Sequence, residues 1–140
     1  MSARPFHAAI LVDDLDAARR FYGDLIGCAE GRSDTDWVDF DLFGNQLVCH
    51  RKIGASSTQS QRNTVDGKSV PVPHWGVILE MHEWQALADR LTEARVEFVI
   101  EPYMRFRGQA GEQGTFFIAD PSGNAIEFKG FADLSQLFAS

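Results

Sequence analysis

Three residues of the chain, His7, His74 and Glu127, are of types that bind divalent metal ions. Each histidine stands near the start of an apolar segment suited to a buried strand. Glu127 is the one polar residue of the segment 125–128, and a lone buried carboxylate costs several kcal/mol unless it is paired or binds a metal. Two imidazoles and one carboxylate would form a facial triad that leaves coordination positions open for Lewis-acid or redox chemistry.

An internal repeat is expected to position these residues. In the first half, apolar runs and period-two alternation predict a helix from 15 to 26 and strands over 6–12, 29–33, 37–43 and 46–51. In the second half, the same signals predict a helix from residue 83 and strands over 72–80, 96–100, a stretch near 104, 115–119 and 125–129. Each half ends on a Gly-Asn turn before its last strand. His7 opens the first repeat and His74 the second.

The repeat predicts an α+β fold, in which two βαβββ units form an incomplete mixed β-barrel around a metal cleft. We expect a single domain over 1–140 with a first module over about 5–52 and a second over about 71–130. The polar stretch of about 53–70 is interpreted as a loop or linker, and 131–140 as a tail with a short helix. A pseudo-twofold axis between the modules would bring the two histidines together.

Bulk properties exclude several classes of function. The net charge of −7 argues against nucleic acid as a partner, and no apolar run approaches the ~18–20 residues of a membrane span. Cys28 and Cys49 have no metal-binding spacing and are interpreted as core thiols in a reducing compartment, so we expect a cytoplasmic protein. The basic cluster at 105–107 either meets a small anionic substrate or is solvated.

The arrangement resembles the vicinal oxygen chelate superfamily, which includes glyoxalase I, extradiol dioxygenases and the fosfomycin- and bleomycin-resistance proteins. The resemblance covers nearly the whole chain, and it rests on His7, the helix segment 17–27, His74 and the segment 120–127 (Asp-Pro-Ser-Gly-Asn-Ala-Ile-Glu). It implies a divalent metal ion held by His7, His74 and Glu127, with Fe²⁺ the first choice and Mn²⁺, Zn²⁺ or Ni²⁺ the alternatives. It also implies a small-molecule substrate and a homodimer.

The branch of the superfamily stays open. Aligning the two Gly-Asn turns places Val48 opposite Glu127, where glyoxalase I-like proteins have a second glutamate ligand. His50, two residues further on, would reach the metal only through a bulge or register shift; otherwise it lines the pocket as a candidate acid or base, or is an exposed strand-end residue.

The extradiol pattern is incomplete as well. Its tyrosine position falls on Phe117 and its further histidine position on Gly108, while Tyr103 has the wrong spacing. His82 is interpreted as a surface residue at the start of the second helix.

These residues favour a metal-dependent enzyme in which Glu127 and His50 are the candidate catalytic groups. A dioxygenase is the first choice because the triad has three ligands. The alternatives are a lyase or isomerase of the glyoxalase I type and a metal-free protein that sequesters a small molecule. The sequence leaves open whether one chain or two complete the site.

Overall fold

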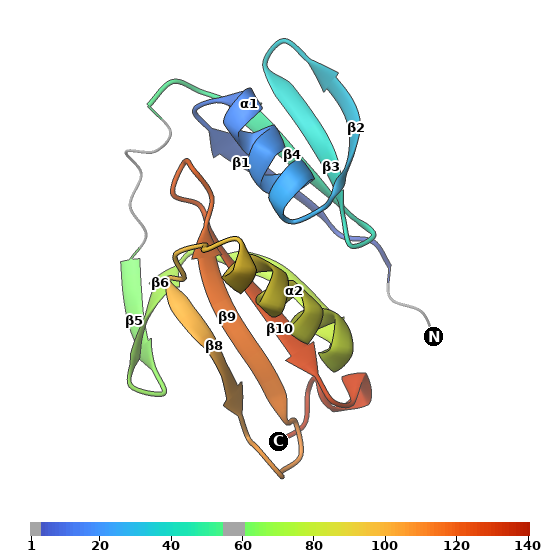
Figure 1. The fold of residues 1–140 in the computed structure, drawn as a ribbon, viewed down its shortest axis with the longest axis vertical. Coiled ribbons are helices and arrows are strands. Elements are labelled where there is room, and N and C mark those ends of the chain that lie inside the picture. Colours follow the sequence, from blue (N-terminus) through green and yellow to red (C-terminus); the bar gives the residue numbers. More distant parts are fainter. Residues whose placement is uncertain (1–3, 55–60) are drawn as a thin grey trace. The chain divides into compact units, whose positions relative to one another are not determined.

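The structure is a computed structural model that describes residues 4–54 and 61–140. The chain divides into two compact units, each built around one four-stranded sheet (Figure 1). The first unit contains Met1–Gln59 and Asp120–Asn124, and the second contains Ser60–Ala119 and Ala125–Ser140. No helix in the described part of the chain is long and apolar enough to cross a membrane.

The first unit has the strand order β1-β4-β3-β2, in which β1 and β4 are parallel and the other pairs antiparallel. Its elements are β1 (His7–Val12), α1 (Leu15–Ala18), η1 (Arg19–Leu25), β2 (Ala29–Asp34), β3 (Trp37–Leu42) and β4 (Asn45–Arg51). Asp14 caps the helix, since its carboxylate accepts from the backbone N–H groups of Asp16 and Ala17. After one α-helical turn the segment continues as a π-helix, which the sequence pattern did not distinguish from an α-helix.

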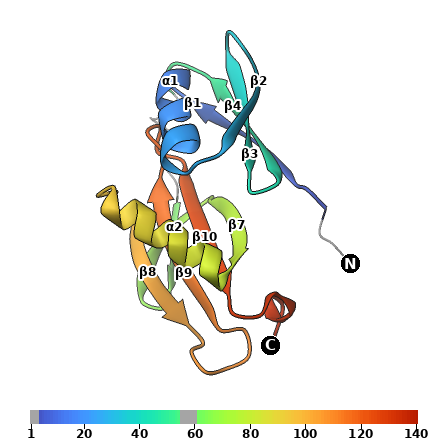
Figure 2. The ribbon, with the colours of Figure 1, turned by 45° about the vertical axis from the view of Figure 1, so that its right-hand side comes forward.

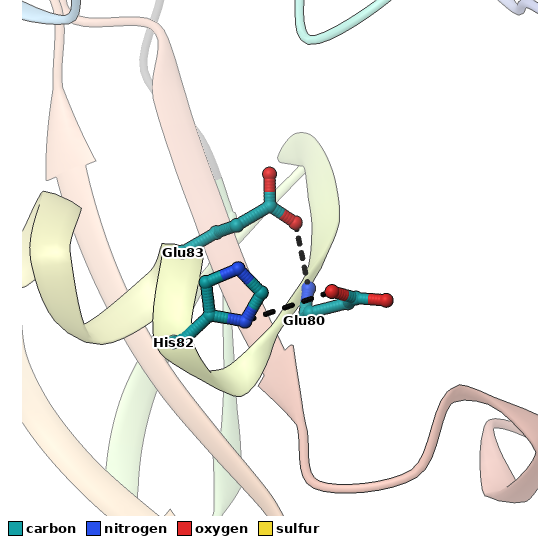
Figure 3. Close-up of side chains that lie close together, drawn as sticks. All are labelled: Glu80, His82 and Glu83. Carbon is teal, nitrogen blue, oxygen red and sulfur yellow. Dashed lines mark hydrogen bonds and ion pairs between the residues drawn. The ribbon is translucent and has the colours of Figure 1, made fainter.

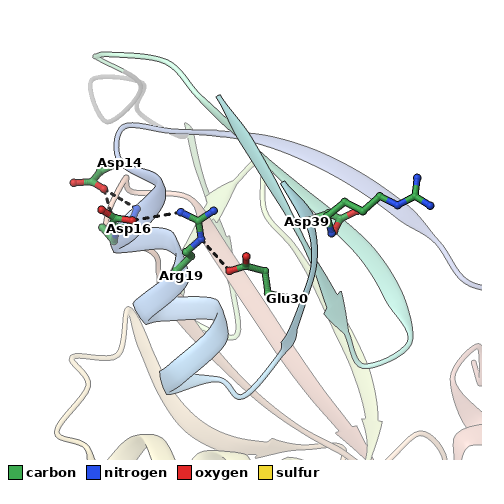
Figure 4. A network of polar contacts seen from close by, with 7 residues as sticks. Asp14, Asp16, Arg19, Glu30 and Asp39 are labelled. Carbon is green, nitrogen blue, oxygen red and sulfur yellow. Dashed lines mark hydrogen bonds and ion pairs between the residues drawn. The ribbon is translucent and has the colours of Figure 1, made fainter. Parts of the chain in front are cut away.

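Exposed ion pairs connect this helix to the sheet. Arg19 contacts Asp16 on its own helix at 3.3 Å and Glu30 on β2 at 2.9 Å (Figure 4). The first turn and β2 are therefore joined by one guanidinium, and such exposed pairs contribute at most about 1 kcal/mol each.

The second unit repeats this order as β7-β10-β9-β8, again with the first two strands parallel. Its elements are β5 (Gln61–Val65), β6 (Lys68–Val72), β7 (Trp75–Glu80), α2 (Met81–Glu93), β8 (Ile100–Arg105), β9 (Gln113–Ala119), β10 (Ala125–Phe131) and η3 (Leu134–Gln136). Helix α2 covers one face of the sheet (Figure 2). Trp84 anchors it, because the indole lies over Gly114 and Gly130 and its Nε1 donates to the Phe128 carbonyl at 2.9 Å.

The α+β fold of two βαβββ-like modules is therefore confirmed, and neither four-stranded sheet closes on itself within residues 4–54 and 61–140. The register also confirms the alignment of the repeats. Ala9 pairs with Val48 in the first sheet, and Gly76 pairs with Glu127 in the second. Val48 and Glu127 are therefore equivalent positions of the two repeats. His7 and His74 are equivalent too, because His7 lies two residues before Ala9 and His74 lies two residues before Gly76.

Three predicted features differ from the structure. The stretch interpreted as a linker contains the hairpin β5–β6, whose turn is Asp66-Gly67, with both φ angles positive; residues 55–60 of that stretch lie outside the described residues. The turn before β4 is Phe43-Gly44 rather than Gly44-Asn45, because Leu42 pairs directly with Asn45. The strand predicted at 96–100 begins only at Ile100.

Both cysteines are buried and free, as expected of core thiols. Burial raises the pKa of Cys28 to about 11 and that of Cys49 to about 12. Both thiols therefore stay protonated at neutral pH, where they are poor nucleophiles and poor metal ligands.

The Asp-Pro-Ser-Gly turn is held by its own buried aspartate. Asp120, Pro121, Ser122 and Gly123 form a turn in which the Gly123 N–H donates to the Asp120 carbonyl at 2.9 Å. One Asp120 carboxylate oxygen accepts from the backbone N–H groups of Ser122 and Asn124, and the other accepts from the Asn124 amide and, at 2.8 Å, from the Tyr22 hydroxyl. Burial and the Asp120 charge raise the pKa of Tyr22 well above its usual value, so the phenol remains a donor.

Replacing Tyr22 with phenylalanine is expected to lower the free energy of unfolding by about 1–3 kcal/mol, because it removes a donor from a buried carboxylate. Tyr103→Phe is the matched control, since Tyr103 also donates to a carboxylate but is only half-buried. Urea denaturation of both variants measures the difference. Equal losses in the two variants would show that the Asp120 contact has no special weight.

Candidate metal centre

The second unit brings two of the three predicted metal ligands into contact. His74 precedes β7, and Glu127 lies on β10 beside it. Their side chains are 27% and 13% exposed, and His74 Nε2 lies 3.1 Å from Glu127 Oε1. The other ring nitrogen, Nδ1, lies 2.7 Å from the Pro71 carbonyl oxygen.

The Pro71 carbonyl fixes the tautomer of His74. A carbonyl oxygen only accepts hydrogen bonds, so Nδ1 must carry the proton. In a neutral imidazole Nε2 then presents a lone pair to the carboxylate of Glu127, and two lone pairs at 3.1 Å repel each other. A cation that both atoms contact, either a proton or a metal ion, removes this repulsion. The donor set and its orientation therefore fit a divalent metal ion.

Two residues on β9 hold this pair in place. The Thr115 hydroxyl donates to Glu127 Oε2 at 2.5 Å, which leaves Oε1 to face His74. The Phe117 ring packs edge-on against the His74 ring, with centroids 4.8 Å apart. Neither role was predicted from the sequence. Thr115 could have been found by pairing 115–119 antiparallel with 125–129, because residues on the same face then alternate.

Thr115→Val is expected to weaken metal binding by about 10-fold, because the variant leaves one Glu127 oxygen without its donor. Thr92→Val is the control, since the Thr92 hydroxyl donates to the Ala88 carbonyl on α2, remote from Glu127 in sequence. Competition with a chromophoric chelator gives both affinities. A Thr115 variant with unchanged metal affinity would contradict the supporting role.

A pocket of about 240 Å³ opens beside the pair. It is lined by His74, Trp75, Gly76, Val77, Ile78, Glu127 and Lys129. On the same side of the sheet, Val70 of the β5–β6 hairpin packs against Ile100 and Phe117. Because Phe117 also contacts the His74 ring, apolar side chains lie next to that ring. The site is thus a small, partly apolar pocket with one imidazole and one carboxylate.

A second polar group adjoins Glu127. The Tyr103 hydroxyl donates to Asp66 at the hairpin turn at 3.0 Å, and Arg105 pairs with the same carboxylate at 2.6 Å. Burial, followed by the Asp66 hydrogen bond, raises the pKa of Tyr103 to about 12, and the charge of Glu127 contributes. A register shift between Ile100 and Tyr103 brings Tyr103 opposite Thr115, two residues along β9 from Phe117, where the extradiol pattern expects its tyrosine.

The first unit holds the remaining predicted residues. His7 is exposed, its Nδ1 lies 2.9 Å from Gln46 Oε1, and the Gln46 amide donates to Asp39. The parallel pairing of β1 and β4 runs without a shift from His7 to Arg51, so the bulge that would move His50 toward His7 is absent from this described pair. His50 lies four residues beyond the partner of His7, and its part in the site stays a prediction.

The comparisons with known proteins decide the family. The family model of the Glyoxalase/Bleomycin resistance protein/Dioxygenase superfamily matches residues 4–128. The chain belongs to this superfamily. Its resemblance to the vicinal oxygen chelate proteins is thereby confirmed at the level of family and fold.

Three solved structures are similar to this one over nearly the whole chain. A glyoxalase/bleomycin resistance protein/dioxygenase from Alicyclobacillus acidocaldarius is 32% identical, with 96% of each chain covered and a TM-score of 0.76. The fosfomycin resistance protein FosX from Listeria monocytogenes is 18% identical, covering 97% of this chain and 98% of its own, with a TM-score of 0.66. A lactoylglutathione lyase from Agrobacterium tumefaciens is 19% identical, covering 93% and 95%, with a TM-score of 0.63. No curated protein matches the chain.

A further cluster of residue types that can bind metal ions has a structural role. Glu80, His82 and Glu83 lie together at the start of α2 (Figure 3). Glu80 and Glu83 form a reciprocal capping box, and His82 lies 3.6 Å from Glu80 with its side chain 78% exposed. The carboxylates thus satisfy the helix terminus, and the interpretation of His82 as a surface residue is confirmed.

Proposed function

We propose that the chain is a metal-dependent enzyme in which His7, His74 and Glu127 hold one divalent metal ion. The observation that carries the proposal is the approach of His74 Nε2 to Glu127 Oε1, with the Pro71 carbonyl fixing the tautomer. We propose His7 as the third ligand, and the strand registers support this because they make His7 the equivalent of His74. We expect a cytoplasmic homodimer that acts on a small molecule.

The bound ion would act as a Lewis acid, or would activate dioxygen, toward a substrate that coordinates through two adjacent oxygens. The chain's own residues set up that step. Thr115 and the Pro71 carbonyl orient Glu127 and His74, and Phe117 restricts rotation of the imidazole. Glu127 and His50 are the candidate proton acceptors.

A dioxygenase that uses Fe²⁺ is the reading that we favour. The repeat supports it, because Val48 occupies the position equivalent to Glu127 and cannot supply the fourth ligand of a glyoxalase I-type centre. A lyase or isomerase is the alternative reaction, and a metal-free protein that sequesters a small molecule is the alternative class.

The reaction is tested by two assays on protein reconstituted with Fe²⁺, Mn²⁺, Zn²⁺ or Ni²⁺. Oxygen uptake with a catechol should depend on Fe²⁺ and should be lost in His74→Ala. The hemithioacetal of methylglyoxal and glutathione should not be turned over with any of the metals. Turnover of the hemithioacetal without oxygen uptake would replace the dioxygenase by an isomerase. No metal-dependent turnover in either assay would contradict both of these reactions.

A further inference from the structure

A lysine shares the pocket of the candidate metal centre. Lys129 lies on β10 two residues after Glu127, and alternate residues of a strand face the same side. Both residues line the pocket of about 240 Å³, together with His74. Two strand residues span about 6.5 Å, which sets the separation of Lys129 from the Glu127 position along the strand.

No described residue forms a salt bridge with the ammonium group of Lys129, and the Glu127 carboxylate lines the other end of the same pocket. The side chain is half-buried, and it forms no hydrogen bond or ion pair with any residue in 4–54 or 61–140. It is also the only lysine or arginine among the described residues that line the pocket. The other basic groups on this face are engaged: Arg105 pairs with Asp66, and Lys68 lies over the Tyr103 ring at 4.5 Å.

The surroundings of Lys129 are those of a binding subsite. Its strand neighbours are Thr115 on β9 and Ile78 on β7, and Trp75 lines the same pocket. An unpaired ammonium in a partly apolar, half-buried pocket gains more from an anionic ligand than an exposed one does, because water screens the interaction less.

We propose that Lys129 binds an anionic oxygen group of the substrate, a carboxylate or a phosphonate, at the end of the pocket away from His74. The substrate is then a small acid that carries two adjacent oxygens and, a few ångströms from them, one anionic group. This inference rests on the proposed metal centre for the position of the adjacent oxygens, but not for the anion-binding role of Lys129.

The anion-binding role is tested on protein loaded with redox-inactive Zn²⁺, by isothermal titration with catechol and with 3,4-dihydroxybenzoate. The two ligands share their chelating oxygens and differ by one carboxylate. The wild type should bind the carboxylated ligand about 10- to 100-fold more tightly than catechol. Lys129→Met should lose this preference while retaining catechol affinity, and Lys129→Arg should keep most of it. Lys52→Met removes the same charge from an exposed position in the first unit and should behave as wild type.

A second titration separates failure of this inference from failure of the metal centre. Benzoate and phenylphosphonate are titrated into metal-free wild type, Lys129→Met and Lys52→Met, with circular dichroism to verify folding. Weaker anion binding in Lys129→Met alone supports the anion subsite. This holds even if the Zn²⁺-loaded protein does not bind catechol, because that second result would contradict only the proposed function. Catechol binding with no gain from the carboxylate in wild type, or equal anion binding in all three proteins, would overturn the role of Lys129.

Discussion

Glu127→Gln is expected to weaken divalent metal binding by about 100-fold or more, because it removes the only carboxylate ligand of the proposed centre. The substitution preserves the shape of the side chain, and the Thr115 hydroxyl can still donate to the amide oxygen. Competition with a chromophoric chelator measures the affinity. Glu101→Gln on β8 removes the same charge from an exposed side chain and should leave the affinity unchanged.

In the metal-free protein, the Glu127→Gln substitution is expected to preserve or raise stability. The glutamine N–H₂ can donate to the His74 Nε2 lone pair, which Glu127 cannot do. We therefore expect metal-free Glu127→Gln to unfold at the same or a higher temperature than metal-free wild type, while added metal should stabilise only the wild type. A variant that binds metal as tightly as wild type would contradict the assignment of Glu127 as a ligand.

Gly76→Ala is expected to lower the free energy of unfolding by about 3 kcal/mol or more and to weaken metal binding as well. A Cβ atom at this position would overlap the Glu127 carbonyl oxygen and lie 2.6 Å from its carbonyl carbon. Because the atoms that a Cβ would meet belong to the backbone of β10, β7 and β10 must move apart at the Gly76–Glu127 pair, next to the candidate metal site. Denaturation and metal titration of the variant measure the two effects.

Gly23→Ala is the matched control for this substitution. Outside the helix itself, the nearest atom to a Cβ there belongs to Phe40, 3.8 Å away, and alanine is favoured in helical segments by up to about 1 kcal/mol. Its stability should be unchanged or slightly higher, with normal metal binding. Equal stability of the two variants would show that β7 and β10 can separate at Gly76 without penalty.

The repeat and its turns could be predicted because each depends on a pattern of residues close together in the sequence. Alternating apolar residues and the recurring Gly-Asn pairs indicate the repeat, and that repeat correctly places Val48 opposite Glu127. The Asp120 turn is equally local, since Asp, Pro and Gly each suit their own turn position. Such patterns depend only on residues that are neighbours in sequence, so they can be interpreted before the fold is known.

The residues that the sequence did not reveal depend on long-range pairing. Thr115 acquires its role only through the register of β9 with β10, and Tyr103 only through a bulge that shifts it relative to Ile100. The hairpin β5–β6 was missed because β5 is exposed along its whole length and polar apart from Val65, although Asp66-Gly67 is a common hairpin turn. No local sequence pattern shows whether a lysine has a salt-bridge partner, so the proposed role of Lys129 follows only from its place in the pocket.

Metal content is the measurement that we would make first, because the proposed centre holds one divalent metal ion with His7, His74 and Glu127. Protein purified anaerobically and reconstituted with Fe²⁺, Mn²⁺, Zn²⁺ or Ni²⁺ is analysed by mass spectrometry of its metals, alongside His7→Ala and His74→Ala. We predict about one ion per chain in the wild type and little in either variant. A wild type that contains no metal and takes up none, or a His7→Ala variant that retains a full ion, would contradict this centre.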